Sequence, residues 1–120
     1  MTQKRLAVGR EGEAIAAEYL LDKGYVLLVR NYSCPLGEID LVVREQDTLV
    51  FVEVRTKTGA SFGLPQESIN NRKQQKLRQL AWYYLKATKQ ENSNCRFDVM
   101  AVTLNRQGKK VRVEHIIDAF

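Results

Sequence analysis

Two stretches in the middle of the chain alternate between apolar and polar side chains, which is the pattern of β-strands. The first runs from residue 37 to 43 and the second from 49 to 57. Alternation with a period of two indicates strands that bury one face, and the polar residues 45–48 between them are typical of a hairpin loop. The pattern therefore predicts an antiparallel hairpin at the centre of the fold.

A turn centred between Gln46 and Asp47 sorts the side chains of this hairpin best. The apolar face then pairs Ile39 with Val54, Leu41 with Val52 and Val43 with Val50. The opposite face pairs Val42 with Phe51, Asp40 with Glu53 and Glu38 with Arg55. A slip of one residue would send one strand's side chains to the wrong face, so the hydrophobic pattern specifies the register. This register places two carboxylates side by side, roughly 5 Å apart at Cβ.

Apolar positions at helical spacing predict two helices, and further β-rich runs predict three more strands. The helices are expected over 8–23, ended by Gly24, and over 66–89, and the other strands over 25–32, 96–104 and 110–117. The resulting order αβββαββ predicts an α/β fold with a mixed sheet of about five strands, against which both helices pack. At 120 residues the chain is expected to form one domain over 1–120.

Composition narrows the class of protein. No apolar run reaches membrane-spanning length and no signal region follows the N-terminus, so we expect a cytoplasmic protein without a membrane partner. Cys34 and Cys95 are too few for a disulfide framework, and no further Cys or His completes a zinc site. The single His115 is expected to be a surface or strand residue rather than a catalytic one. The net charge of +5 favours a polyanionic partner, although many basic proteins bind no nucleic acid.

The paired carboxylates carry the candidate chemistry. Oxygens of Asp40 and Glu53, held close on a rigid sheet, suit a hard divalent cation such as Mg²⁺. Arg55 and Lys57 follow on the same strand face and could stabilise negative charge on a phosphoryl group, and Lys73 could contact a phosphate. The plainer alternative is that this face is the solvated side of a sheet, with Glu38 and Arg55 forming an ion pair across the strands.

The order of elements, the segment Gly37-Glu-Ile-Asp40 and the segment Phe51-Val-Glu-Val-Arg-Thr-Lys57 together resemble the PD-(D/E)xK nuclease superfamily. Within that superfamily the chain resembles the YraN-type family of small bacterial endonuclease-like proteins, which are similar to archaeal Holliday-junction resolvases. The resemblance covers nearly the whole chain. It runs from Gly9-Arg-Glu-Gly-Glu13 through Arg96-Phe-Asp98 to Ala119-Phe120.

The resemblance implies a restriction-endonuclease-like core and a site for Mg²⁺ or Mn²⁺. Asp40 and Glu53 would be metal ligands, and Glu13 would complete the acidic cluster directly or through water. The superfamily motif has Lys where this chain has Arg55. Arginine stays protonated and cannot act as a general base, although it can orient a water or neutralise charge. Lys57 is the first candidate to replace the missing lysine and Lys73 the second.

The leading expectation is a Mg²⁺-dependent endonuclease that acts on DNA, including branched or unpaired structures. Two alternatives remain: a non-catalytic nucleic-acid-binding module that kept the fold, and a protein-interaction factor in DNA maintenance. Phosphate contacts are expected from Lys57, Arg72, Lys73, Lys76 and Arg78. Because resolvase-like enzymes work as dimers, the resemblance also leaves a homodimer open, although nothing in the sequence marks an interface.

Overall fold

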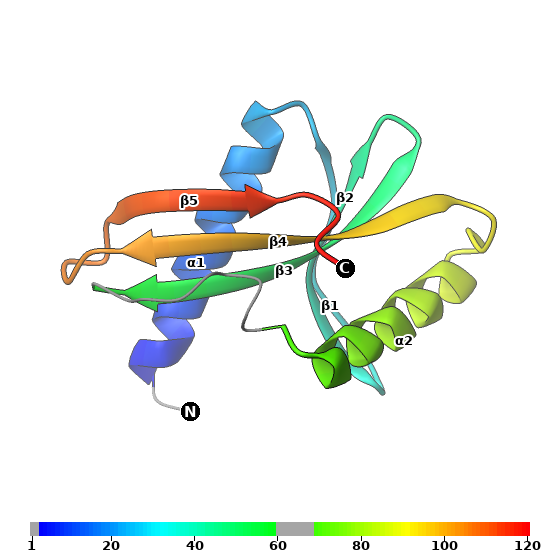
Figure 1. Cartoon of the computed structure of the whole chain (residues 1–120), viewed down its shortest axis with the longest axis horizontal. Helices are drawn as coiled ribbons and strands as arrows, with labels where there is room; N and C mark the ends of the chain where they lie inside the picture. The colour runs from blue at the N-terminus through cyan, green and yellow to red at the C-terminus, as the bar shows by residue number, and fades with distance from the viewer. Residues whose placement is uncertain (1–2, 60–68) are drawn as a thin grey trace.

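The computed structural model describes residues 3–59 and 69–120, in which two helices flank one five-stranded mixed sheet (Figure 1). The elements are α1 (Gln3–Asp22), β1 (Val26–Cys34), β2 (Gly37–Glu45), β3 (Thr48–Thr58), α2 (Asn71–Ala87), β4 (Asn94–Leu104) and β5 (Lys110–Ile116). This is the order predicted from the sequence, and the α/β, restriction-endonuclease-like class is confirmed. None of the helices within the described ranges is long and apolar enough to cross a membrane.

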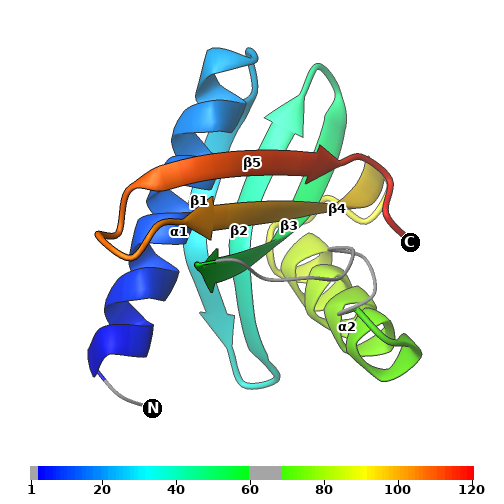
Figure 2. The same ribbon diagram turned by 60° about the vertical axis from the view of Figure 1, so that its left-hand side comes forward.

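The strands lie in the order β1-β2-β3-β4-β5, with β3 and β4 parallel and the other neighbours antiparallel. The predicted hairpin register is confirmed where β2 and β3 pair, since Leu41 faces Val52 and Val43 faces Val50. This ladder ends at Leu41 and Val52, and beyond it β2 turns away from β3 (Figures 1 and 2). The ladder pairs predicted for Asp40 with Glu53 and for Glu38 with Arg55 are therefore wrong, because the two strands have already separated.

The core has two layers, one on each face of the sheet, and Figure 2 shows the two helices on opposite sides. The α1 layer contains Leu20, Leu41, Val43, Val50, Val52, Met100 and Val102. The α2 layer contains Ile39, Val42, Phe51, Leu77, Leu80 and Tyr84. Ile39 was predicted on the face of Leu41 and Val43 and lies on the other one. The alternation of β2 breaks at Asp40, where the strand leaves the ladder.

Glycines shape α1 at two points. Gly24 has a φ of +93°, and its N–H donates to Leu21 O while Tyr25 N–H donates to Leu20 O, both at 3.0 Å. This left-handed conformation ends the helix where the sequence predicted. Gly12 lies directly against the side chain of Thr56, so a β-carbon there would overlap it. The helix thereby approaches β3 closely.

The second helix begins later than predicted. Asn70 caps it, because its Oδ1 accepts a hydrogen bond from the backbone N–H of Lys73 at 2.9 Å. The predicted start at residues 66–68 lies outside the described residues. Helix α2 ends at Ala87, just short of the expected Lys89, whose φ of +57° is left-handed.

A buried charge network joins β4, β5 and the C-terminal residues. Asp98 is fully buried and accepts hydrogen bonds from Arg96 Nε and Asp118 N–H, both at 3.0 Å, while His115 Nε2 lies 2.7 Å away. Burial by itself would raise the pKa of Asp98, but these hydrogen bonds hold it below its usual value. His115 is a strand residue, as expected, and the network ties β5 and Asp118 to β4.

Candidate functional site

The carboxylates of Asp40 and Glu53 lie where β2 and β3 separate. Glu53 is only 8 % exposed, and Asp40 Oδ2 accepts a hydrogen bond from the backbone N–H of Val54 at 2.8 Å. The Val54 N–H lies just beyond the end of the β2–β3 ladder, and it bonds to the Asp40 side chain. The split in the sheet therefore holds both acidic side chains, even though they are not ladder partners.

Both carboxylates are hard to ionise in this position. Burial raises the pKa of Glu53 to about 7, and the negative charge of Asp40 adds to the rise, whereas Lys73 and Arg55 oppose it. Burial likewise raises the pKa of Asp40, against the Val54 hydrogen bond and the charge of Lys73. Two neighbouring carboxylates with raised pKa values, Glu53 buried and Asp40 half-buried, form a site where a bound cation would relieve electrostatic repulsion.

Two cations reach Glu53 from different elements. Lys73 Nζ lies 3.7 Å and Arg55 Nε 3.8 Å from the same oxygen, Oε1. Lys73 comes from the first turn of α2, where Asn70 fixes its backbone. Lys57 follows Arg55 on β3, roughly 13 Å along the strand from Glu53 at about 3.3 Å per residue. The structure thus brings Lys73 to the carboxylates, although the sequence ranked Lys57 first.

Glu13 approaches the site from α1. Burial raises its pKa, the negative charge of Asp40 raises it further, and a hydrogen bond with Asn31 on β1 opposes the rise. Nevertheless, no group of three or more His, Cys, Asp or Glu side chains within the described ranges is close enough to hold a metal ion directly. Asp40 and Glu53 therefore remain the candidate direct ligands, and Glu13 lies close enough for the charge of Asp40 to raise its pKa.

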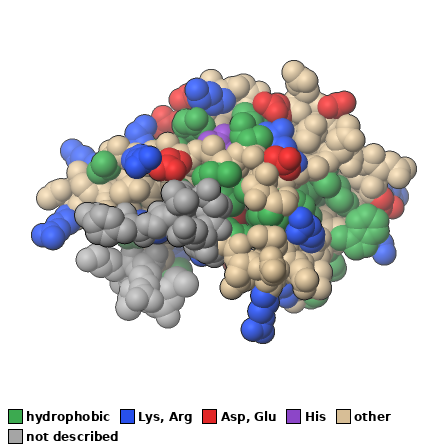
Figure 3. All heavy atoms as spheres, in the orientation of Figure 1, with side chains coloured by type: hydrophobic (Ala, Val, Ile, Leu, Met, Phe, Trp, Pro, Cys, Tyr) green, Lys and Arg blue, Asp and Glu red, His purple; other side chains and the backbone are tan. Residues whose placement is uncertain are grey.

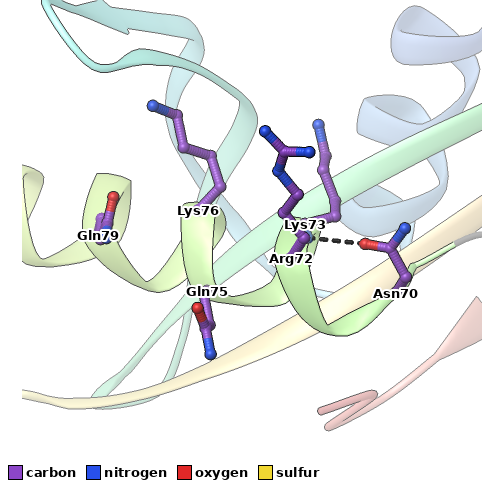
Figure 4. A pocket seen from close by; sticks show the side chains of 6 residues that line it. All are labelled: Asn70, Arg72, Lys73, Gln75, Lys76 and Gln79. Carbon is purple, nitrogen blue, oxygen red and sulfur yellow. Dashed lines mark hydrogen bonds between the residues drawn. The ribbon is translucent and has the colours of Figure 1, made fainter.

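A basic groove begins at Lys73 and follows α2. We use this name for the hollow of about 530 Å³ that is lined by Asn70, Arg72, Lys73, Gln75, Lys76 and Gln79. Figure 4 shows Arg72, Lys73 and Lys76 pointing to the same side of the helix. Three cations that the sequence proposed as phosphate contacts therefore line one groove, and Lys73 connects this groove to Glu53.

Arg78, the remaining cation that the sequence placed on this helix, lies elsewhere. Its guanidinium carbon is 5.6 Å from the ring centroid of Phe97 and 5.3 Å from that of Phe120. The two rings stack at 5.0 Å, so Arg78 helps to hold the C-terminal residue against β4.

Sequence reasoning missed Asn70, which positions Lys73. Residue type alone could have indicated it, because Asn is a preferred N-cap residue. Its side-chain oxygen accepts a hydrogen bond from the backbone N–H three residues later, here that of Lys73. The hydrophobic pattern, continued back to residue 66, instead predicts a start before this cap.

Comparison with known proteins gives consistent matches. The model of the uncharacterised protein family UPF0102 matches residues 12–102. A UPF0102 protein from Pelotomaculum thermopropionicum is 53% identical over the full length of both chains, and one from Moorella thermoacetica is 51% identical, also over both full lengths. One from Dictyoglomus thermophilum is 35% identical over 94% of this chain and 96% of that protein. Glu13, Asp40, Glu53 and Lys73 all lie within the matched range of residues.

Proposed function

The chain belongs to the uncharacterised protein family UPF0102, and we propose that it is a Mg²⁺- or Mn²⁺-dependent endonuclease that acts on DNA. The observation that carries this proposal is the position of Asp40 and Glu53. Both are held in the split between β2 and β3, at the end of a groove lined by cations. Carboxylates beside a basic groove are the arrangement needed to bind a divalent cation next to a phosphate backbone.

The donor set fits a hard divalent cation. Asp40 and Glu53 offer carboxylate oxygens, which Mg²⁺ and Mn²⁺ prefer, and Mg²⁺ needs few protein ligands because it keeps several waters. The raised pKa of Glu53 favours the same conclusion, since a cation there would stabilise the ionised form. Bound at this position, the ion would supply Lewis-acid catalysis at a phosphoryl oxygen.

The cations of the chain have separate roles. Lys73, 3.7 Å from Glu53, keeps the charge of the site balanced and places an ammonium group where negative charge grows on the phosphate in the transition state. Arg55 carries a guanidinium, which is not a general base, so its role is to neutralise charge and orient groups.

Arg72 and Lys76 bind the phosphates on either side of the reacting one. Arg72 lies in the first turn of α2, where the helix dipole disfavours a positive side chain, and that turn has no acidic residue to offset it; Lys76 follows one turn later on the same side. Cations that share one side of the helix without an acidic residue in the described lining favour an anion as the ligand of the groove.

The test is a cleavage assay on labelled duplex, single-stranded, flapped and four-way DNA, with Mg²⁺, with Mn²⁺ and with chelator. We expect cleavage of at least one substrate with metal and none with chelator. Asp40→Asn and Glu53→Gln should each lower the rate about a hundredfold or more. Asp47→Asn removes an exposed carboxylate from the hairpin turn and should leave the rate unchanged. Absence of cleavage on every substrate, or equal cleavage by all variants, would contradict the proposal.

The second candidate function is a non-catalytic nucleic-acid-binding module, which Arg55 at the position of the motif's lysine favours. Arg55→Lys restores the usual residue and discriminates between the two. An enzyme should keep or gain activity with this substitution. If neither the wild-type protein nor Arg55→Lys cleaves any substrate while both bind DNA, the chain is a binding module.

A further inference from the structure

Helix α2 carries exposed aromatic side chains on its C-terminal half. Trp82 is 51 % and Tyr83 39 % exposed, and Leu36, in the turn between β1 and β2, is 40 % exposed. These three residues, with Gln79, Lys86 and Ala87, line a hollow of about 670 Å³, which we call the aromatic platform. Figure 3 shows hydrophobic side chains on the surface around the C-terminal half of α2. Exposed apolar surface of this kind marks an interaction site.

The aromatic platform is continuous with the basic groove. Gln79 lines both hollows, and Lys76, Gln79 and Tyr83 follow one another at the spacing of a single helix face. At a rise of 1.5 Å per residue, Lys76 and Trp82 are about 9 Å apart along the helix axis. The turn that carries Leu36 also lies against this face, because Gly37 is close to the side chains of Lys76 and Leu80. One surface therefore leads from the carboxylates, past the cations, to the aromatic rings.

The charges around this surface indicate the chemistry of its partner. Arg72, Lys73, Lys76 and Lys86 line it, Lys86 Nζ lies 5.8 Å from the ring centroid of Trp82, and neither hollow has an acidic residue in its described lining. A symmetric dimer through this surface would bury its cations without an acidic residue in either described lining to pair with them. A partner with flat apolar groups and a negatively charged backbone is complementary to both the aromatic platform and the basic groove.

We propose that the aromatic platform stacks the unpaired bases of single-stranded DNA whose phosphates lie in the basic groove. This inference rests on the proposed function, to which it adds the substrate class: DNA with a single-stranded segment next to the cleaved bond. Every base has a π-face, so stacking on Trp82 and Tyr83 is tolerant of sequence. The bases of an intact duplex already stack on their neighbours and cannot reach the rings.

Trp82 is the only tryptophan in the chain, so its fluorescence reports on the platform directly. The protein is titrated in chelator with oligo(dT) of about 12 nucleotides, a length within the usual site size for single strands. A blunt duplex of the same length is the comparison, and anisotropy of labelled DNA gives the affinities independently. We expect the single strand to quench the fluorescence in proportion to binding, whereas the duplex leaves it nearly unchanged.

Substitutions separate stacking from charge. Trp82→Ala and Tyr83→Ala should each weaken binding of oligo(dT) about tenfold, as expected for loss of one stacked base, and should change duplex binding little. Trp82→Phe keeps an aromatic ring and should retain most of the affinity, which keeps the test valid if an Ala variant unfolds. Val111→Ala, an exposed apolar residue on β5, is the matched control and should bind like wild type.

Wild-type affinity of Trp82→Ala for oligo(dT), or equal quenching by duplex and single strand, would overturn the inference. A dimer in sedimentation that Trp82→Ala dissociates, with DNA binding intact, would assign the platform to a protein interface instead. All of these measurements are made without metal and without cleavage. If Trp82→Ala binds oligo(dT) like wild type while Asp40-dependent cleavage persists, the single-strand inference is wrong and the endonuclease proposal is still supported.

Discussion

Lys73 on α2 and Glu53 on β3 form an ion pair, with Nζ 3.7 Å from Oε1. The pair exists because α2 packs through Leu77 and Leu80 on the face of the sheet opposite α1. Its N-cap, Asn70, places the first turn beside the split between β2 and β3. The Lys73–Glu53 contact therefore joins the basic groove to the carboxylate site.

Lys73→Met should lower the rate of DNA cleavage at saturating DNA by about a hundredfold, because a cation aimed at the transition-state charge is lost. Lys57→Met should lower it less, since Lys57 lies farther along β3. Single-turnover rates and separately measured DNA affinities for the two variants provide the check. A larger rate loss in Lys57→Met would mean that Lys57, and not Lys73, stabilises the transition-state charge.

Glu53 should make the metal-free protein less stable as the pH rises. Its pKa is about 7 in the folded protein and about 4.5 unfolded, so the folded state holds the proton more tightly. The stabilisation is complete below pH 4.5 and is lost as the pH rises to 7. Glu53→Gln removes this term, and its unfolding free energy at pH 8 should exceed that of wild type by at most about 3 kcal/mol. Denaturant unfolding at pH 4 and pH 8 in chelator measures this, and the difference between the two proteins at pH 8 should disappear at pH 4.

A divalent cation that binds Asp40 and Glu53 should raise the melting temperature. At a hundredfold excess over its Kd, it stabilises the folded state by about 2.7 kcal/mol, which is several degrees for a domain of this size. Asp40→Asn should lose most of the rise, while its amide oxygen can still accept from Val54 N–H and preserve the fold. Melting curves with chelator and with millimolar Mg²⁺ or Mn²⁺ test this, with Asp47→Asn as the control that keeps the rise.

Replacing both Arg72 and Lys76 by Ala should weaken DNA binding at low salt and reduce the dependence of affinity on salt. Each lost phosphate contact lowers the slope of log K against log salt by about 0.9, so the double variant should lose nearly two. Arg106→Ala with Lys109→Ala removes the same charge from the exposed turn between β4 and β5. An equal change in slope for both pairs would mean that net charge, and not the groove, controls binding.

Gly12→Ala should destabilise the protein by about 1–3 kcal/mol, because the new β-carbon overlaps the side chain of Thr56 and pushes α1 off the sheet. Gly9→Ala, with no atom within 4 Å of the added carbon, should instead stabilise the helix by about 0.5–1 kcal/mol. Denaturant midpoints of the two variants compare them directly. Equal midpoints would show that α1 does not approach β3 so closely.

Local patterns predicted much of the fold. The alternation of residues 37–57 determined the β2–β3 register as far as Leu41 and Val52, and Gly24 determined the end of α1. These features depend on neighbours in the sequence: side-chain alternation for a strand, and the left-handed conformation that glycine adopts easily for a helix end. The element order followed from the same patterns.

The sequence by itself also determined which residues stand at the candidate site, since Asp40 and Glu53 were singled out by their place in the hairpin. Only the tertiary structure decided how they are held. Two alternating runs look alike whether or not the strands stay paired, so the pattern could not show that β2 leaves β3 at Asp40 and turns Ile39 to the α2 layer. The choice of Lys73 over Lys57 likewise depends on where α2 packs, which is set by burial of its apolar face against β2 and not by any local spacing.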